Sequence, residues 1–98
     1  MTLTIKPESR TEYLASLRAV LVPARSEPGC VFLYANESVD EPGTIVLHER
    51  WRDLDEYVNE VLQRDYFQQY LKLSENAYAA PRIVVMLNPI EPLDQNTP

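Results

Sequence analysis

The chain has 98 residues, of which 45% are hydrophobic, and a net charge of −6, as expected for one globular domain spanning residues 1–98. The negative charge and the absence of any run of Lys or Arg argue against nucleic-acid binding. No apolar run approaches the ~20 residues of a membrane helix, and no signal peptide is visible. The single cysteine excludes an internal disulfide, so we expect a soluble protein of the reducing cytoplasm.

Hydrophobic periodicity predicts a first strand over residues 2–6, ended by Pro7, and then a helix. The helix opens near Ser9, and Pro23 is expected to bend or end it. Its apolar side consists of Tyr13, Leu14, Leu17, Val20 and Leu21.

Residues 30–36 predict a second strand that is apolar on both faces. Simple alternation puts Cys30, Phe32 and Tyr34 on one face and Val31, Leu33 and Ala35 on the other. Residues 37–43 form a polar connection that ends in a Pro-Gly pair, which suits a hairpin with a loose loop.

The stretch 44–67 organises the rest of the chain, because a strand there changes into a helix at Asp53. Along the strand, one face carries Ile45, Leu47, Glu49 and Trp51, and the other carries Val46, His48 and Arg50. The helix repeats apolar residues at helical spacing, with Tyr57 about one turn in. We therefore expect any small-molecule site where this strand end and this helix meet.

A second helix is predicted after Asp65, which is a candidate N-cap, and it would bury Phe67, Tyr70, Leu71 and Ser74. Residues 82–88 predict a fourth strand, and residues 89–98 an extended or loose tail. The order strand, helix, strand, strand, helix, strand is that of an α+β, ferredoxin-like fold with a four-stranded antiparallel sheet and a core over residues 2–88.

Two helices cover one face of such a sheet and leave about 400 Å² of the other face exposed. Because the strands are apolar on both faces, this area is near the upper end of what monomers tolerate. We therefore expect a two-fold homodimer packed through the sheet faces, with Val31, Leu33, Val46 and His48 or their neighbours at the interface.

Two motifs resemble the antibiotic-biosynthesis monooxygenase family, which includes quinol monooxygenases. They are E-P-G-C at residues 27–30, before the second strand, and E-R-W at residues 49–51, closing the third. The D-E-P-G sequence at residues 40–43 also matches, at the expected spacing. The resemblance implies a dimeric α/β barrel with a pocket between helices and sheet. It also implies oxidation of a small quinol or polyphenol by molecular oxygen without metal, flavin or haem.

Trp51 and Tyr57 have the spacing of a tryptophan and a tyrosine in a family oxygenase that acts on aromatic polyketides. Leu47 stands where that enzyme has an asparagine, and Leu71 where it has an arginine. Glu60 or Val61 occupies the position at which many members carry a histidine. The fold motifs of the family are present in this chain, whereas several polar site residues are replaced.

The predicted catalytic residues are Tyr57, Trp51 and Glu49, and the predicted substrate-binding residues are Trp51, Tyr57, Phe67 and Leu47. Tyr57 would hold or deprotonate a phenol, Glu49 would act as base or hydrogen-bond acceptor, and Trp51 would stack on the substrate. Each of these side chains also suits simple packing. We interpret His48 as an interface residue and Cys30 as a buried thiol. With one His, one Cys and no close-set group of ligands, we expect no tight binding of a transition metal.

Three functions remain open at this point. The first is a cofactor-independent monooxygenase, and the second is a non-oxidative enzyme on the same scaffold, such as an isomerase. The third is a module that only holds a ligand. A fold alone does not decide among them.

Overall fold

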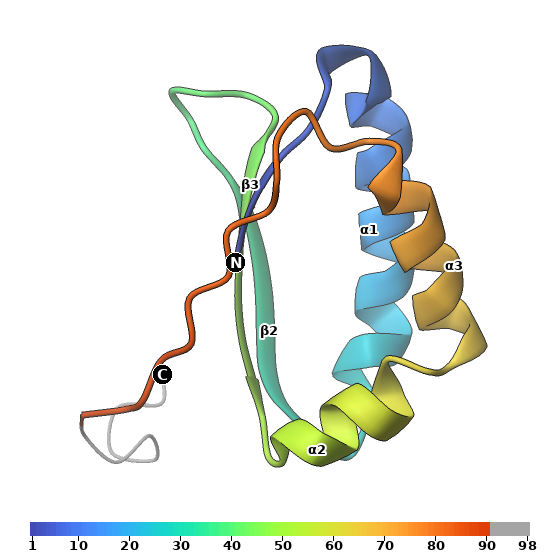
Figure 1. Ribbon diagram of the computed structural model, residues 1–98, viewed down its shortest axis with the longest axis vertical. Coiled ribbons are helices and arrows are strands. Elements are labelled where there is room, and N and C mark those ends of the chain that lie inside the picture. The colour runs from blue at the N-terminus through green and yellow to red at the C-terminus, as the bar shows by residue number, and fades with distance from the viewer. Residues whose placement is uncertain (91–98) are drawn as a thin grey trace.

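The structure is a computed structural model that describes residues 1–90. A sheet forms one layer, and the helices cover one of its faces (Figure 1). The strands are β1 (Thr2–Thr4), β2 (Cys30–Glu37) and β3 (Thr44–Trp51), and the long helices are α1 (Arg10–Arg25) and α3 (Asp65–Glu75). The short helical segments are η1 (Pro7–Ser9), α2 (Leu54–Glu56) and η2 (Tyr57–Val61). No helix within residues 1–90 is long and apolar enough to cross a lipid bilayer.

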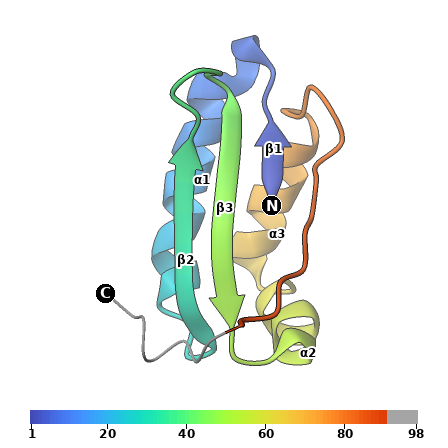
Figure 2. The same ribbon diagram turned by 90° about the vertical axis from the view of Figure 1, so that its left-hand side faces the viewer.

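Strand β3 lies in the middle of the sheet, with β1 on one side and β2 on the other, both antiparallel to it (Figure 2). The β2–β3 hairpin turns at Gly43, whose φ of 94° favours glycine. The predicted α+β, ferredoxin-like arrangement is therefore confirmed, with the helices on one face. Within residues 1–90, however, the sheet has three strands rather than the predicted four.

The prediction of a fourth strand over residues 82–88 is wrong. The segment runs beside β1, where the Thr2 N–H donates to Ile83 O at 2.8 Å and the Ile83 N–H donates to Thr2 O at 2.9 Å. Because β1 begins at Thr2, the residues after Ile83 meet no further β1 backbone, and the four that follow keep 53–72% of their surface exposed. Of the predicted tail, residues 91–98 lie outside the described part of the chain.

The alternation predicted along β3 is confirmed. Ile45 and Leu47 are buried under the helices, with 1% and 9% of their surface exposed. Val46 and His48 are exposed on the opposite side of the sheet, which we call the open face. The Phe32 ring meets His48 edge-on at a centroid distance of 4.9 Å, so the partner strand presents an aromatic side chain there as well.

The alternation predicted along β2 is confirmed from Phe32 onward, where Phe32 and Tyr34 share one face and Leu33 and Ala35 the other, but it is wrong for Cys30. A β-bulge between Cys30 and Phe32 shifts the register by one residue, and a bulge resets which face each side chain takes. Leu33 is buried under the helices, opposite Glu49, so the face that it shares with Ala35 is the helical face and Leu33 is not at the predicted interface. Cys30 also packs against the core, whereas Phe32 and Tyr34 lie on the open face beside His48.

The core lies between the helices and the sheet, and its two buried tyrosines satisfy each other: the hydroxyls of Tyr13 and Tyr70 are 2.7 Å apart. Pro23 lies inside α1 rather than ending it, because α1 continues to Arg25. A proline this close to the end of a helix removes only one hydrogen bond. The buried apolar residues are Leu3, Ile5, Tyr13, Leu17, Val20, Ala24, Leu33, Ile45, Leu47, Val61, Phe67, Tyr70 and Ala77.

The helical return after β3 starts at Asp53, whose carboxylate caps α2 by accepting the Glu56 N–H at 3.0 Å. The chain then widens into one turn of π-helix, η2, which begins at Tyr57. Helix α3 follows with Arg64 at the N-cap position, so Asp65 is its first residue and not its cap as predicted. Phe67 and Tyr70 are buried as predicted.

Candidate functional site

The two motifs that carry the family resemblance lie side by side. The E-P-G-C turn enters β2, E-R-W ends β3, and Cys30 is the register partner of Trp51. The Arg52 N–H donates to the Gly29 carbonyl at 2.8 Å. A Cβ on Gly29 would displace the Glu56 carboxylate, which is the flexible end of a side chain held by Arg52. The site is therefore built where α2 returns over the ends of β2 and β3.

Glu27 links the E-P-G-C turn to the start of α3 by hydrogen bonds. Its Oε2 atom accepts hydrogen bonds from Arg64 Nε at 2.7 Å and from the Tyr66 hydroxyl at 2.6 Å. The hydrogen bond and positive charge of Arg64 hold the pKa of Glu27 below its usual value. The side chain of Glu27 is only 9% exposed, so this ion pair is better shielded from water than a typical surface pair.

Trp51 and Tyr57 are brought together as the sequence predicted. Their rings stack with centroids 4.6 Å apart and an interplanar angle of 28°. Phe67 meets Tyr57 edge-on at 6.2 Å, so α3 contributes the third ring. Glu49 lies on the same strand face, where its Oε1 accepts the indole N–H of Trp51 at 2.8 Å. Leu47, one further step along that face, is buried core.

The Tyr57 hydroxyl is a hydrogen-bond donor rather than a base in this environment. Burial raises the pKa of Tyr57, and the nearby Glu49 carboxylate raises it further, while Arg82 acts weakly in the opposite direction. The phenol is consequently protonated at neutral pH. Of the two roles considered for Tyr57 from the sequence, holding a substrate oxygen fits this environment and deprotonating the substrate does not.

Glu49 is the group suited to accept a proton. One carboxylate oxygen, Oε1, is occupied by the Trp51 indole N–H, which fixes the orientation of the side chain. The second oxygen remains the candidate acceptor for a substrate hydroxyl, beside the protonated Tyr57. The Glu49 carboxylate can accept the proton of a substrate hydroxyl, and the neighbouring neutral phenol of Tyr57 can donate a hydrogen bond to the oxygen that loses it.

Sequence reasoning missed that Cys30 belongs to this neighbourhood. Burial raises the pKa of the Cys30 thiol, as does the negative charge of Glu49, whereas Arg25 opposes both effects. The thiol is therefore close to the cluster but weakly nucleophilic. The β-bulge that turns Cys30 toward the helices leaves no trace in simple alternation, so only the two-motif adjacency could have pointed to it.

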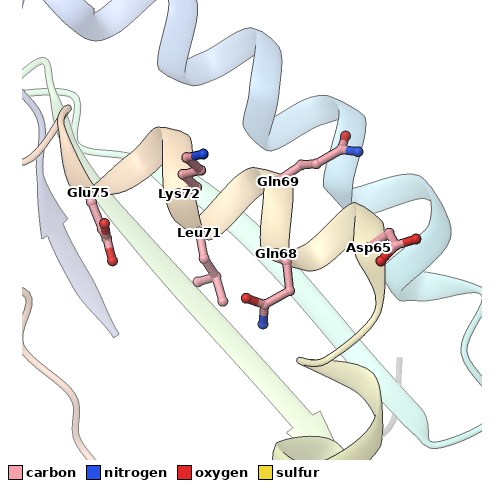
Figure 3. A pocket seen from close by; sticks show the side chains of 6 residues that line it. All are labelled: Asp65, Gln68, Gln69, Leu71, Lys72 and Glu75. Atoms are coloured by element: carbon pink, nitrogen blue, oxygen red, sulfur yellow. The ribbon is translucent and has the colours of Figure 1, made fainter.

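Two hollows lie elsewhere on the molecule. One of about 500 Å³ follows α3, and all of its lining side chains come from that helix (Figure 3): Asp65, Gln68, Gln69, Leu71, Lys72 and Glu75. It includes Leu71, which the resemblance aligned with an arginine of the polyketide oxygenase, and the adjacent Lys72. The second, of about 260 Å³, lies between α1 and the sheet, lined by Arg10, Leu14, Leu17, Arg18, Leu21, Ala35, Asn36, Glu37 and Ile45. Neither hollow is lined by the three predicted catalytic residues.

Comparison with known proteins agrees with the motifs. The family model described as antibiotic biosynthesis monooxygenase matches residues 1–73, which include both motifs and the whole of the Trp51–Tyr57–Phe67 cluster. This match confirms the resemblance.

Three relatives are similar over most of this chain. The uncharacterized protein sll1783 of Synechocystis is 30% identical over 80 residues, covering 79% of this chain but 52% of that protein, so the chain spans about half its length. YcnE of Bacillus subtilis, named provisionally as a monooxygenase, is 30% identical over 83 residues, covering 83% of this chain and 84% of YcnE. The solved structure of Rv0793 from Mycobacterium tuberculosis is 27% identical, with a TM-score of 0.81 over 93% of this chain and 91% of that one. The chain therefore belongs to the antibiotic biosynthesis monooxygenase family.

Proposed function

We propose that this protein is a cofactor-independent monooxygenase that oxidises a small quinol or polyphenol with molecular oxygen. The observation that carries the proposal is the contact of three groups. The Glu49 carboxylate accepts a hydrogen bond from the Trp51 indole N–H, and the protonated Tyr57 stacks on that indole. Membership of a family described as monooxygenases supports the reaction class. The cytoplasm, expected from the single cysteine, is the compartment that we propose.

In the proposed reaction the phenolic ring of the substrate lies against the aromatic cluster and gives its hydroxyl proton to Glu49. The resulting anion is electron-rich, and a ring carbon forms a bond to one atom of dioxygen. Loss of water from the hydroperoxide then leaves a carbonyl, so a phenol and O₂ give a quinone and H₂O. The substrate supplies all the electrons. Tyr57 donates a hydrogen bond to the oxygen that becomes anionic.

The test is an aerobic screen of simple quinols and naphthols, with oxygen uptake and product mass recorded against an enzyme-free blank. We expect uptake of one O₂ per quinone formed, and turnover that depends on Glu49. The matched control is Glu12→Gln, which removes an equal charge from an exposed position on α1 and should retain activity. Turnover that proceeds equally well without oxygen would instead establish the isomerase alternative. Binding without turnover would establish a ligand-binding module.

We also propose that the protein is a homodimer assembled through its open face. Phe32 stacks with Tyr34 at 5.3 Å and meets His48 at 4.9 Å, which makes an aromatic cluster on that face. Tyr34 and Val46 are 52% and 41% exposed. Apolar surface of this kind is typical of protein interfaces. A second copy of the chain packed face to face would bury this apolar surface, because both copies present the same open face.

The sheet edges support a second copy as the occupant of this surface. The outer edge of β2 has no strand neighbour within residues 1–90, and an unpaired edge of eight residues is a template for strand addition. The apolar residues that follow Ile83 are rich in strand formers and exposed, with Ile90 fully so. If this segment pairs with the β2 edge of the other copy, both unpaired backbones are satisfied at once.

A further inference from the structure

Aromatic rings form a continuous path from the candidate site to the start of α3. Trp51 stacks on Tyr57 at 4.6 Å, Tyr57 meets Phe67 at 6.2 Å, and Phe67 contacts Tyr66 at 5.5 Å. A branch runs from Phe67 to the buried tyrosine Tyr70 at 6.3 Å. These are contact distances between ring centroids, so each ring touches the next. Electron exchange between rings in contact is fast compared with exchange across a gap of similar width filled by saturated carbon.

The two branches end differently. The Tyr66 hydroxyl donates to the Glu27 carboxylate at 2.6 Å, which is a short, charge-assisted hydrogen bond. In the other branch, the Tyr70 hydroxyl pairs with the neutral hydroxyl of Tyr13 at 2.7 Å. A carboxylate is a far better proton acceptor than a phenol. Tyr66 is also partly exposed, whereas Tyr13 and Tyr70 are buried.

The proton acceptor decides which tyrosine can hold an oxidation. A phenol that loses an electron becomes a very strong acid, so the neutral tyrosyl radical forms readily only if the proton has somewhere to go. Glu27 is ionised at neutral pH because Arg64 stabilises its charge, and its Oε2 already receives the Tyr66 hydrogen bond. Of the two branches, the one through Tyr66 is therefore the one prepared for one-electron oxidation.

We propose that the path Trp51–Tyr57–Phe67–Tyr66 carries oxidising equivalents out of the site to Tyr66, with Glu27 as proton acceptor. The proposal rests on the proposed function in one respect: the oxidant is protonated superoxide, which forms when the substrate anion gives one electron to O₂, the superoxide takes the proton held by Glu49, and the pair separates before the carbon–oxygen bond forms. Protonated superoxide takes a hydrogen atom from the Tyr57 hydroxyl and becomes H₂O₂. An electron from Tyr66 then reduces the Tyr57 radical, which regains a proton from water, while the Tyr66 proton passes to Glu27. The net change is one Tyr66 radical and one H₂O₂ for each superoxide consumed.

Such a path protects the residues at which oxygen reacts. Trp51 and Tyr57 of the candidate site are both easily damaged by oxidation, and a radical held at Tyr66 is accessible to small reductants in solution. The path thereby resets the site without a resident cofactor.

The test needs no substrate, so its outcome is independent of whether the monooxygenase proposal holds. Purified protein is treated with hexachloroiridate(IV), a one-electron oxidant, and oxidation of Trp51 is followed by peptide mass spectrometry. Radicals are identified in rapidly frozen samples by electron paramagnetic resonance. We expect a tyrosyl signal that disappears in Tyr66→Phe, and several-fold faster oxidation of Trp51 in that variant. Tyr34→Phe removes an exposed tyrosine outside the path and should change neither.

Two further comparisons separate relay from simple scavenging. Phe67→Leu keeps Tyr66 but interrupts the ring contacts, and it should also expose Trp51 to faster oxidation. Glu27→Gln removes the proton acceptor and should weaken protection, whereas Arg64→Gln breaks the same ion pair but leaves the carboxylate for Tyr66. Near-ultraviolet circular dichroism verifies that each variant is folded. Equal rates of Trp51 oxidation in the unmodified protein and in Tyr66→Phe would overturn the proposal.

Discussion

At the scale of single residues, the candidate site depends on a hydrogen-bond acceptor, Glu49, lying beside a hydrogen-bond donor, Tyr57. Tyr57 is protonated because burial and the Glu49 charge both raise its pKa. Glu49 is held in place by the Trp51 indole N–H at 2.8 Å. The pair therefore offers a hydrogen-bond acceptor and a donor to one substrate, which suits a reaction in which the substrate provides the electrons.

Replacing Tyr57 by Phe should remove the donor while keeping the ring that stacks on Trp51. We expect kcat on an established substrate to fall by about 10²-fold, because hydrogen bonding to a developing oxyanion is lost. KM and the free energy of unfolding should change little. Steady-state kinetics and urea unfolding measure the two quantities. Unchanged kcat would mean that Tyr57 only packs.

The buried tyrosine pair predicts loss of stability in alkali. Burial raises the pKa of Tyr13 to about 12, and the pKa of its partner Tyr70 is raised as well. Above the ordinary pKa of about 10, the unfolded chain loses these protons while the folded chain keeps them. The free energy of unfolding should then fall as pH rises, by up to about 1.4 kcal/mol per pH unit for each tyrosine.

Urea unfolding at several pH values above about 9 measures how the free energy of unfolding changes with pH. The double variant Tyr13→Phe/Tyr70→Phe removes both hydroxyls together, so no polar group is left unpaired, and its stability should depend less on pH. Tyr34→Phe, on the open face, serves as the control. An identical slope in the double variant would show that other groups cause the alkaline loss.

At the scale of elements, most of the fold follows from periodicity, and the exceptions have local causes. The strand face carrying Ile45, Leu47 and Trp51 is readable from the sequence, since alternation is unbroken along β3. On β2 a single bulge before Phe32 puts Cys30 on the opposite face from Phe32 and Tyr34, and nothing in the residue types marks it. For the same reason the nearness of Cys30 to the site is not predictable from alternation.

The fourth strand illustrates a different limit. Residues 82–88 have the composition of a strand, but a strand requires a partner backbone, and β1 offers one only as far as Thr2. The amino-acid composition therefore predicts that this segment is able to form a strand, whereas actual strand pairing also requires a neighbouring backbone along its length. The site cluster was predictable because Trp51 and Tyr57 are close in sequence and the helical return fixes their distance.

The β2–β3 hairpin is closed by Glu37. Its carboxylate accepts two hydrogen bonds from Arg10, at 2.8 and 2.6 Å, and one from the Gly43 N–H at 2.9 Å. The Arg10 hydrogen bond, followed by that of Gly43, lowers the pKa of Glu37 to about 2. Since the unfolded pKa is about 4.3, the stabilisation is present above that value and is lost as pH falls toward the folded pKa.

Glu37→Gln should therefore lower stability at neutral pH and make the remaining stability less sensitive to acid. Thermal unfolding at a series of acidic pH values measures both effects. Glu41→Gln changes the same charge at an exposed position of the same hairpin and should behave like the unmodified protein. Equal acid sensitivity in Glu37→Gln and the unmodified chain would show that the carboxylate is not what closes the hairpin.

At the scale of the whole molecule, the isolated chain is asymmetric. Helices cover one face of the sheet (Figures 1 and 2). The open face and the segment after Ile83 present apolar side chains to solvent. An asymmetry of this kind is relieved by association, and a two-fold axis brings identical open faces together. The candidate site lies on the helical side of the sheet, so such a dimer would leave it accessible.

Sedimentation at micromolar concentration should accordingly give a species of twice the 11.3 kDa chain mass. Val46→Asp places a charge on the open face and should shift the equilibrium toward monomer. Val39→Asp makes the same change in the β2–β3 connection, where Val39 is 94% exposed, and should leave the dimer intact. A species of 11.3 kDa throughout the micromolar range would refute the dimer.

The measurement that tests the central claim most directly is the isotopic composition of the product formed under ¹⁸O₂. The protein should accelerate quinone formation above the enzyme-free rate, with one labelled oxygen atom in each product molecule and the other released as water. Glu49→Gln should lower the rate by about 10²-fold, because the substrate proton loses its acceptor. A product that carries no label, or a rate no faster than the enzyme-free reaction with every quinol tried, would contradict the assignment of oxygen chemistry to this site.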